Sequence, residues 1–267
     1  MNRVSTIDLQ NKKNRHQKIV CCTAYDVTMA KLADAAMDIV LVGDSLGMVV
    51  QGHPHTIQVS IEEMIYHTRC VNRGLKRAHL MADMPFLSYQ LNADQAVENA
   101  GKLLQAGAQS VKLEGGAFIA DLVARMAQVG IPVMAHIGMT PQSVHKWGGY
   151  RVQGKEPAHR DGLLRDAKIL EEKGAFALLL EAMPEDLARE ITQQAKIPTI
   201  GIGAGPDCDG QILVINDLLG MDASFHPKFL KKYANLSEII QSALKNYADD
   251  VQGGRYPEIE HSYHKGH

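Results

Sequence analysis

The feature that most constrains the fold of this chain is a short apolar, β-branched run followed by a helical stretch, repeated along almost its whole length. Continuous apolar runs of this kind, separated by helices, are typical of parallel strands that are buried on both faces. The runs that we assign to strands are Ile19–Thr23, Ile39–Val42, His79–Ala82, Ser110–Leu113, Val133–His136, Ala177–Leu180, Thr199–Ile202 and Ile212–Ile215.

The number and spacing of these units predict how they are assembled. Eight strand-plus-helix units that close on themselves form a TIM (β/α)8 barrel of roughly 250 residues, close to the 267 residues of this chain. The interval between Ile202 and Ile212 is too short for a full helix, so a doubly wound open sheet stays as the alternative. We predict one α/β domain over residues 1–267, with a short N-terminal lead-in and a disordered C-terminal tail, 252–267.

Composition argues against two classes of partner. The chain has 28 Lys and Arg residues against 30 Asp and Glu, a net charge of −2, and no basic block of the kind that nucleic-acid-binding proteins carry. No apolar run approaches the roughly 20 residues of a membrane span. The start of the chain, Met1–Thr6, is polar, unlike a signal peptide. We therefore expect a cytoplasmic protein that binds neither nucleic acid nor a membrane.

Ionisable side chains follow five successive predicted strands, where the loops of a barrel line its active face. They are Asp44, Asp83, Glu114, His136 and Glu181. A single carboxylate here is readily explained as a helix cap or a solvated loop residue, but glutamates are poor caps. Carboxylates that converge on one pocket repel each other unless they are protonated or neutralised by a cation. Because their oxygens are hard ligands and no His/Cys cluster accompanies them, the pattern favours Mg²⁺ over Zn²⁺.

Two further groups in these strands allow more than one interpretation. Lys112 lies two residues before Glu114 in one strand, so both side chains point to the same side. Three interpretations of Lys112 are open: an ion pair with Glu114 or Asp83, a cation that binds the carboxylate of an anionic substrate, or a Schiff-base lysine. His136 ends a buried run, where a histidine is either a satisfied core group or a catalytic acid.

The longest break between units, Met139–Pro157, contains several glycines and suggests an active-site lid or a binding loop. The glycine-rich Gly201–Gly205 either binds phosphate through backbone N–H groups or brings the chain close to a neighbour.

Several long strings carry a family resemblance. They include Val42-Gly43-Asp44-Ser45-Leu46-Gly47-Met48-Val49, Ala82-Asp83-Met84-Pro85-Phe86, Val111-Lys112-Leu113-Glu114-Gly115-Gly116 and His136-Ile137-Gly138-Met139-Thr140-Pro141-Gln142. Together with others between residues 6 and 247, these strings resemble the 3-methyl-2-oxobutanoate (ketopantoate) hydroxymethyltransferase family. The segment Gln51–His55 departs from the pattern expected there, but it contains none of the candidate site residues.

The resemblance implies a TIM barrel, dependence on Mg²⁺ and a homo-oligomer, typically a decamer. The implied reaction transfers a hydroxymethyl group from 5,10-methylenetetrahydrofolate to 3-methyl-2-oxobutanoate, giving 2-dehydropantoate for pantothenate biosynthesis. Its partners are therefore a small 2-oxo acid and a folate.

The resemblance also implies a role for each candidate residue. Asp44 and Asp83 resemble the metal ligands, with Glu114 completing the metal site directly or through water. Ser45 and Lys112 resemble the groups that hold the substrate carboxylate, and the metal-binding Asp44 and Asp83 also contact the substrate. Glu181 resembles the proton acceptor, with His136 as an auxiliary group.

The chemistry of this reaction suits these residue types. Removing a proton from the carbon next to a ketone creates an enolate, which Mg²⁺ stabilises as a Lewis acid. Desolvation at the end of an apolar strand is expected to raise the pKa of Glu181 toward working pH, as a base requires.

Two other functions stay as alternatives. The first is a Mg²⁺-dependent 2-oxo acid lyase or mutase of the isocitrate lyase type, but the sequence contains no catalytic cysteine loop such as a Lys-Lys-Cys-Gly-His string. The second is a non-catalytic scaffold that binds a carboxylate ligand. Intact acids at every candidate position argue against the second.

Overall fold

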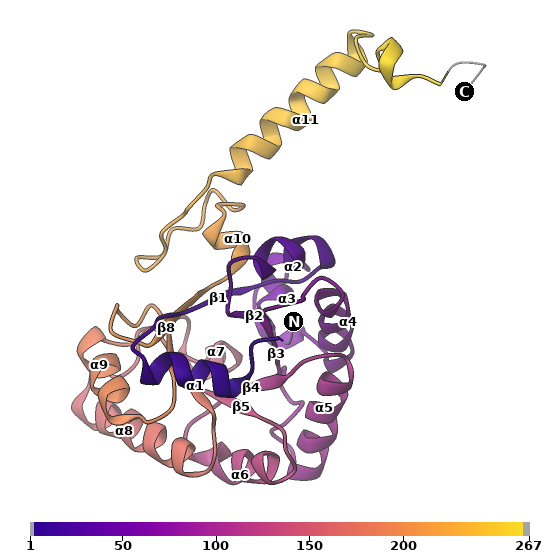
Figure 1. Cartoon of the computed structure of the whole chain (residues 1–267). Coiled ribbons are helices and arrows are strands. Elements are labelled where there is room, and N and C mark those ends of the chain that lie inside the picture. Colours follow the sequence, from indigo (N-terminus) through magenta and orange to yellow (C-terminus); the bar gives the residue numbers. More distant parts are fainter. Residues whose placement is uncertain (1–2, 264–267) are drawn as a thin grey trace. The chain divides into compact units, whose positions relative to one another are not determined.

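The computed structural model describes residues 3–263, which divide into two units, one up to Ile215 and one from Asn216 onward. The first unit is a closed barrel of eight parallel strands in sequence order (Figure 1), with β8 paired to β1. The strands are β1 (Ile19–Thr23), β2 (Ile39–Val42), β3 (His79–Asp83), β4 (Ser110–Glu114), β5 (Val133–Gly138), β6 (Ala177–Glu181), β7 (Thr199–Ile202) and β8 (Gly210–Leu213). The predicted TIM (β/α)8 barrel is confirmed.

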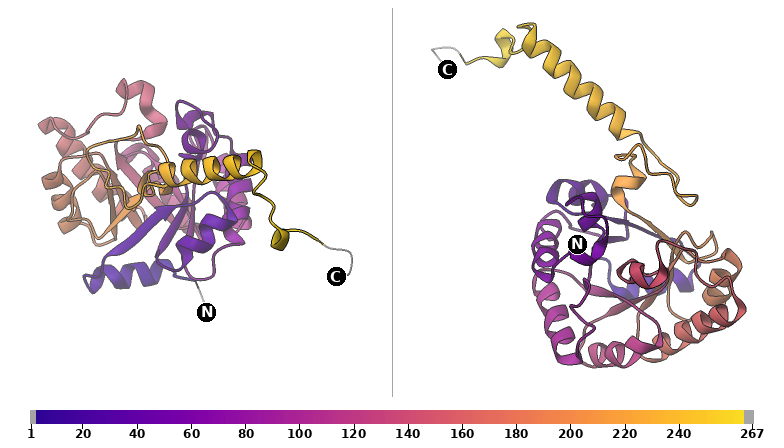
Figure 2. Two further views of the ribbon diagram at one scale, coloured as in Figure 1. Left: turned by 90° about the horizontal axis from the view of Figure 1, so that it is seen from above. Right: turned by 180° about the vertical axis from the view of Figure 1, so that it is seen from behind.

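Helices surround the strands of the first unit (Figure 2). The α-helices are α1 (Thr6–Asn14), α2 (Val27–Asp34), α3 (Leu46–Val49), α4 (Ile61–Asn72), α5 (Ala93–Gln105), α6 (Ala120–Gln128), α7 (Val144–Trp147), α8 (Pro157–Glu172) and α9 (Glu185–Gln194), and the 3-10 helices are η1 (Thr56–Gln58), η2 (Ala117–Ile119) and η3 (Pro141–Ser143). Strand β7 leads directly into β8, and every residue of the intervening loop is described, so the short interval there indeed holds no helix.

The boundaries predicted for strand β8 are wrong. The apolar run placed this strand at Ile212–Ile215, but it begins two residues earlier, at Gly210, and Ile215 already starts a helix. Gly210 pairs with Ile19 on one side and with Ile200 on the other. A Cβ at this position would lie 2.4 Å from the Ile19 carbonyl oxygen, so only glycine permits this approach. Hydrophobicity alone does not reveal a strand residue that lacks a side chain.

The half of the barrel interior at the N-terminal ends of the strands is mostly apolar. Leu9 of α1 packs into it against inward-facing residues of the strands, including Ile39, Met81, Met134 and Leu179. Each of these side chains is at most 4% exposed, and burying one typically contributes about 1.5–3 kcal/mol. His79 and Ser110, at the N-terminal ends of β3 and β4, are buried polar groups that hydrogen-bond to each other at 2.7 Å, whereas Lys112 and the carboxylates lie toward the C-terminal ends of the strands.

The second unit contains α10 (Ile215–Leu218), which starts at the boundary, α11 (Leu236–Gln252) and the 3-10 helix η4 (Ile259–His261). The last residues of the tail predicted to be disordered, 264–267, lie outside the described residues. The organisation of 1–267 as one domain stays a prediction. Within residues 3–263, no helix is both long enough and apolar enough to cross a membrane.

Candidate active site

The site residues follow from the two-residue periodicity of the strands. In β3 the inward-facing Met81 is followed two positions later by Asp83, and in β6 Leu179 is followed by Glu181. Because alternate side chains of a strand point to the same face, the residue after each core position also points into the barrel, one layer higher. The same step leads from Met134 to His136 in β5. Asp83, Glu114, His136 and Glu181 therefore form the layer above the apolar residues, and Asp44, which lies two residues beyond β2, contacts this layer from the loop.

Lys112 connects much of this layer. Its Nζ lies 3.2 Å from Asp83 Oδ1 and 3.7 Å from Glu114 Oε1, and its side chain is only 5% exposed. Burial opposes the charge of Lys112, but the carboxylates of Asp83 and Glu114 outweigh it and hold the pKa of the ammonium above its usual value. Both ion pairs considered for this lysine are present, and neither prevents the ammonium from also binding an anion.

Asp83 and Glu114 are buried carboxylates with unused acceptor capacity. Burial raises the pKa of Asp83 to about 7, although the Lys112 charge opposes the shift. Burial likewise raises the pKa of Glu114 well above its usual value. One oxygen of each, Asp83 Oδ1 and Glu114 Oε1, forms no hydrogen bond within the described chain and faces the Lys112 ammonium instead. Such oxygens are electrostatically costly unless a further cation or donor reaches them.

Asp44 joins this group through the backbone and through an amide. Its N–H donates to Asp83 Oδ2 at 3.0 Å, and its Oδ2 accepts a hydrogen bond from Gln142 Nε2 at 2.8 Å. The backbone N–H of Gln142 donates to Glu114 Oε2 at 2.9 Å. Gln142 therefore holds two of the proposed metal-binding carboxylates at once.

Gln142 and its neighbour Tyr89 are site residues that the sequence reasoning missed. The Tyr89 hydroxyl lies 2.9 Å from Gln142 Oε1 and accepts from the Glu114 N–H at 3.1 Å. Gln142 stands in a matched string, but an uncharged amide in a loop gives no electrostatic signal. Tyr89 comes from the loop after β3, and nothing in its sequence context points to a site.

Ser45 lies at the rim of the same cluster. A Cβ on Gly43 would lie 2.7 Å from Ser45 Oγ and 3.5 Å from Asp83 Oδ2, so both side chains flank the Gly43 backbone. The hydroxyl of Ser45 is 2.8 Å from that of Tyr25. Ser45 is partly exposed, which leaves its hydroxyl within reach of a ligand in the barrel mouth.

His136 and Glu181 continue the layer along β5 and β6. Burial, together with the Lys112 charge, lowers the pKa of His136 well below its usual value, so the ring is neutral. Its Nδ1 lies 3.2 Å from Lys112 Nζ and accepts from the ammonium, which leaves the ring proton on Nε2, 3.3 Å from Glu181 Oε2. Burial raises the pKa of Glu181 to about 7, and the Lys112 charge opposes this shift. A carboxylate with this pKa is suited to accept a proton near neutral pH.

The donor set fits Mg²⁺ bound partly by the protein. Within residues 3–263, no three His, Cys, Asp or Glu side chains are already arranged as metal ligands. Mg²⁺ rarely uses an all-protein cage and is commonly held by one or two carboxylates plus substrate oxygens and water. The neighbouring Asp44 and Asp83, the second with an oxygen that forms no hydrogen bond within the described residues, fit this mode.

The segment after β5 lies at the mouth of the barrel. It runs through η3 and α7 to Gly148, whose φ of +64° ends the helix in the left-handed conformation. Beyond it, the Tyr150 hydroxyl donates to Met48 Sδ at 3.4 Å. Burial and the charges of Glu181 and Asp44 raise the pKa of Tyr150, so its hydroxyl lies within electrostatic range of the carboxylate layer.

A closed (β/α)8 barrel with carboxylates, a buried ammonium and a carboxyl group with a pKa of about 7 at the C-terminal ends of its strands has the arrangement of an enzyme active site. Comparison with known proteins identifies the family. The model of ketopantoate hydroxymethyltransferase matches residues 3–259. The chain belongs to this family, as its sequence predicts.

Individual relatives agree. A 3-methyl-2-oxobutanoate hydroxymethyltransferase of Anaeromyxobacter sp. (strain Fw109-5) is 53% identical over 98% of this chain and 88% of its own length. Another from Syntrophus aciditrophicus (strain SB) is 51% identical over 98% of this chain and 97% of its own length.

Solved structures share the fold at much lower identity. A phosphonopyruvate hydrolase in complex with oxalate and Mg++ has a TM-score of 0.63 at 14% identity, covering 98% of this chain and 93% of its own. A 2,3-dimethylmalate lyase has a TM-score of 0.60 at 15% identity, covering 95% of this chain and 89% of its own. These likenesses show a shared fold alone.

Proposed function

We propose that this enzyme transfers a hydroxymethyl group from 5,10-methylenetetrahydrofolate to 3-methyl-2-oxobutanoate in pantothenate biosynthesis. The C3–H bond of the 2-oxo acid is broken, and C3 forms a bond to the methylene carbon of the folate. Water supplies the hydroxyl group, and tetrahydrofolate leaves. The names carried by relatives at about half identity over nearly the whole chain support this reaction. The observation that carries the mechanism is Glu181, with a pKa of about 7, beside His136 and close to the carboxylates around Lys112.

The carboxylates and the ammonium divide substrate binding between them. Asp44 and Asp83 hold Mg²⁺ together with the substrate, and Glu114 completes the metal site from its position beside Lys112. When bound, Mg²⁺ supplies Lewis acidity next to the ketone oxygen. The Lys112 ammonium and the Ser45 hydroxyl bind the substrate carboxylate, because they offer donors within an otherwise acidic cluster.

Glu181 removes the C3 proton. Its pKa of about 7 makes it ionised in a large fraction of molecules at neutral pH, yet basic enough to accept a proton from carbon once the ketone is polarised. His136 is the auxiliary group. Its Nε2–H faces Glu181 Oε2, and its Nδ1 is fixed by Lys112, so the imidazole orients the base.

The reaction is tested by incubating the purified protein with both substrates and following 2-dehydropantoate by mass spectrometry. We expect product with Mg²⁺ and none with EDTA or without the folate. Asp44→Ala should abolish the Mg²⁺-dependent signal. Cleavage of the 2-oxo acid without folate would favour the lyase alternative, and the absence of any product would refute the proposal.

We also propose that the enzyme acts in the cytoplasm as a homodecamer, as the family resemblance implies. Light scattering after gel filtration would then give ten times the 29.3 kDa chain mass. A monomeric mass would contradict the decamer but not the reaction.

A further inference from the structure

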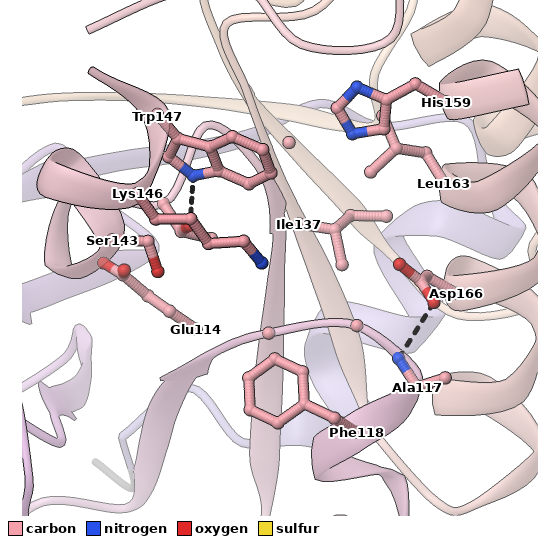
Figure 3. A pocket seen from close by; sticks show the side chains of 14 residues that line it. Glu114, Ala117, Phe118, Ile137, Ser143, Lys146, Trp147, His159, Leu163 and Asp166 are labelled. Atoms are coloured by element: carbon pink, nitrogen blue, oxygen red, sulfur yellow. Dashed lines mark hydrogen bonds between the residues drawn. The ribbon is translucent and has the colours of Figure 1, made fainter. Parts of the chain in front are cut away.

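A cavity adjoins the carboxylate layer. It has a volume of about 270 Å³ and lies above the C-terminal ends of β4 and β5, between the segment that follows β5 and helix α8. Glu114, Gly138 and Thr140 belong to its wall, so it opens next to the site already described. In Figure 3 the Lys146 side chain points into this cavity, and Asp166 faces it from the α8 side. The proposed chemistry does not use either residue.

Lys146 and Asp166 carry opposite charges, yet neither forms an ion pair with any residue in the described range. Asp166 Oδ1 accepts the Ala117 N–H at 2.9 Å. Its carboxylate lies against the β4 loop because position 116 is glycine: a Cβ there would lie 2.0 Å from Asp166 Oδ2. The cavity thus offers an acceptor on one side and a charged donor on the other, and each has capacity for a ligand.

Aromatic side chains supply flat surfaces in the same cavity. Phe118 is 76% exposed although it lines the cavity, and Trp147 lies across from it (Figure 3). The Trp147 ring is stacked with His159 at a centroid distance of 5.8 Å, which fixes its orientation. An exposed phenylalanine beside a charged donor and acceptor is the arrangement expected around a planar heterocycle with polar edges.

We propose that this cavity binds the pterin ring of the folate co-substrate. The carboxylate of Asp166 accepts hydrogen bonds from the N–H groups of the aminopyrimidinone edge, Lys146 donates to the carbonyl oxygen of that edge, and Phe118 stacks on the ring. This inference rests on the proposed function. A volume of about 270 Å³ lies below the roughly 300–1,000 Å³ typical of sites for whole drug-sized ligands. The cavity therefore accommodates the ring system, and the rest of the folate extends beyond it.

The other substrate does not suit these walls. A 2-oxo acid is an anion without N–H donors, so the Asp166 carboxylate repels it. A pterin brings donors and an acceptor on one planar edge, which matches the two charges. The shared wall at Glu114 and Gly138 lets the one-carbon unit face the carbon from which Glu181 removes a proton, because Gly138 pairs with Glu181 across β5 and β6.

The test uses the full chain and its single tryptophan, Trp147, as the reporter. Tetrahydrofolate is titrated under anaerobic conditions while Trp147 fluorescence is followed, and Kd is compared among variants. Asp166→Asn keeps an oxygen that can accept the Ala117 N–H but removes the charge, and Lys146→Met removes an exposed ammonium. Asp161→Asn is the matched control, because Asp161 is exposed on the same helix and does not line the cavity. Circular dichroism melting verifies that each variant is folded.

We expect Asp166→Asn and Lys146→Met each to raise Kd about tenfold or more, as the loss of a charge-assisted hydrogen bond does. Asp161→Asn should bind as the wild type does. Wild-type Kd values in both cavity variants would overturn the pterin site, even if the wild type makes 2-dehydropantoate. A wild type that binds tetrahydrofolate with the expected variant pattern but forms no product would refute the proposed reaction and leave the site standing. No binding in the wild type would overturn both.

Discussion

The role of Glu181 makes a quantitative prediction about pH. Proton removal from C3 of 3-methyl-2-oxobutanoate needs ionised Glu181, whose pKa burial raises to about 7. At pH 5 only about 1% of the molecules then carry the ionised base, and at pH 8 about 90% do. The rate of proton removal should therefore rise up to about 90-fold over this range, with a midpoint near pH 7. A bound divalent cation favours the ionised carboxylate and shifts the midpoint downward.

The assay is exchange of the C3 proton for deuterium, followed by NMR in D₂O with Mg²⁺ and without folate. Omitting the folate isolates proton removal from the later transfer. Glu181→Gln should slow the exchange by about 10²- to 10⁴-fold, the usual contribution of a general base, and should remove the pH midpoint. Substrate binding, measured by calorimetry, should stay detectable because Lys112 and the carboxylates of the metal site are intact.

Retention of both the exchange rate and its pH midpoint in Glu181→Gln would refute this assignment. The base would then lie elsewhere, with His136 as the next group to test. A wild-type midpoint well above 7 would also contradict the reasoning, since neither Lys112 nor an added cation can raise the pKa of this carboxylate.

Three further predictions concern the carboxylate layer. Gln142→Met should weaken Mg²⁺ binding about 10- to 100-fold in calorimetry, because Asp44 loses the side-chain amide that orients it. The control is Gln90→Met, which removes a hydrogen bond to Gln142 but no contact to Asp44 and should leave Mg²⁺ binding unchanged. Lys112→Met should raise the KM for the 2-oxo acid more than it lowers kcat, and borohydride should trap no imine in the wild type; a trapped imine would instead show Schiff-base chemistry. The pKa of Asp83 is raised from 3.8 to about 7, so the folded protein retains a proton that the unfolded chain loses. The proton on Asp83 therefore adds about 4 kcal/mol to the free energy of unfolding below about pH 4, and this stabilisation is lost as pH rises through 7. Urea unfolding in EDTA should show this loss for the wild type relative to Asp83→Asn, and Mg²⁺ should offset it at pH 8. A wild type whose stability relative to Asp83→Asn rises with pH would contradict the sign.

The barrel was predictable because its strands carry a strong signal. Parallel strands buried on both faces need continuous apolar residues, and the predicted start of each of the first seven strands agrees with the structure. The predicted ends were less accurate. Asp83, Glu114 and Glu181 are themselves strand residues, paired with Lys112, His136 and Ile202. A charged residue at the end of an apolar run looks like the start of a loop, although the backbone hydrogen bonds of the sheet continue through it.

The sequence likewise predicted the charged groups of the site better than the uncharged ones. The acids at the strand ends were predictable because charge after a buried strand needs an explanation. Gln142 was not, because a neutral amide becomes important only when the fold places its Nε2 at 2.8 Å from Asp44 Oδ2 and its N–H at 2.9 Å from Glu114 Oε2. Asp166 shows the same limit for a charged residue, since a helical aspartate in sequence looks solvated until Gly116 allows it to reach the β4 loop.

These two cases share a physical cause. Gln142 and Asp166 each act across segments distant in sequence, so their partners are fixed by the closure of the barrel and not by local spacing. The strand ends, in contrast, are set by a local two-residue period that any buried strand obeys. Strand periodicity therefore predicts which charged groups lie together at the ends of the strands, and only the closed barrel reveals which neutral or remote groups contact them.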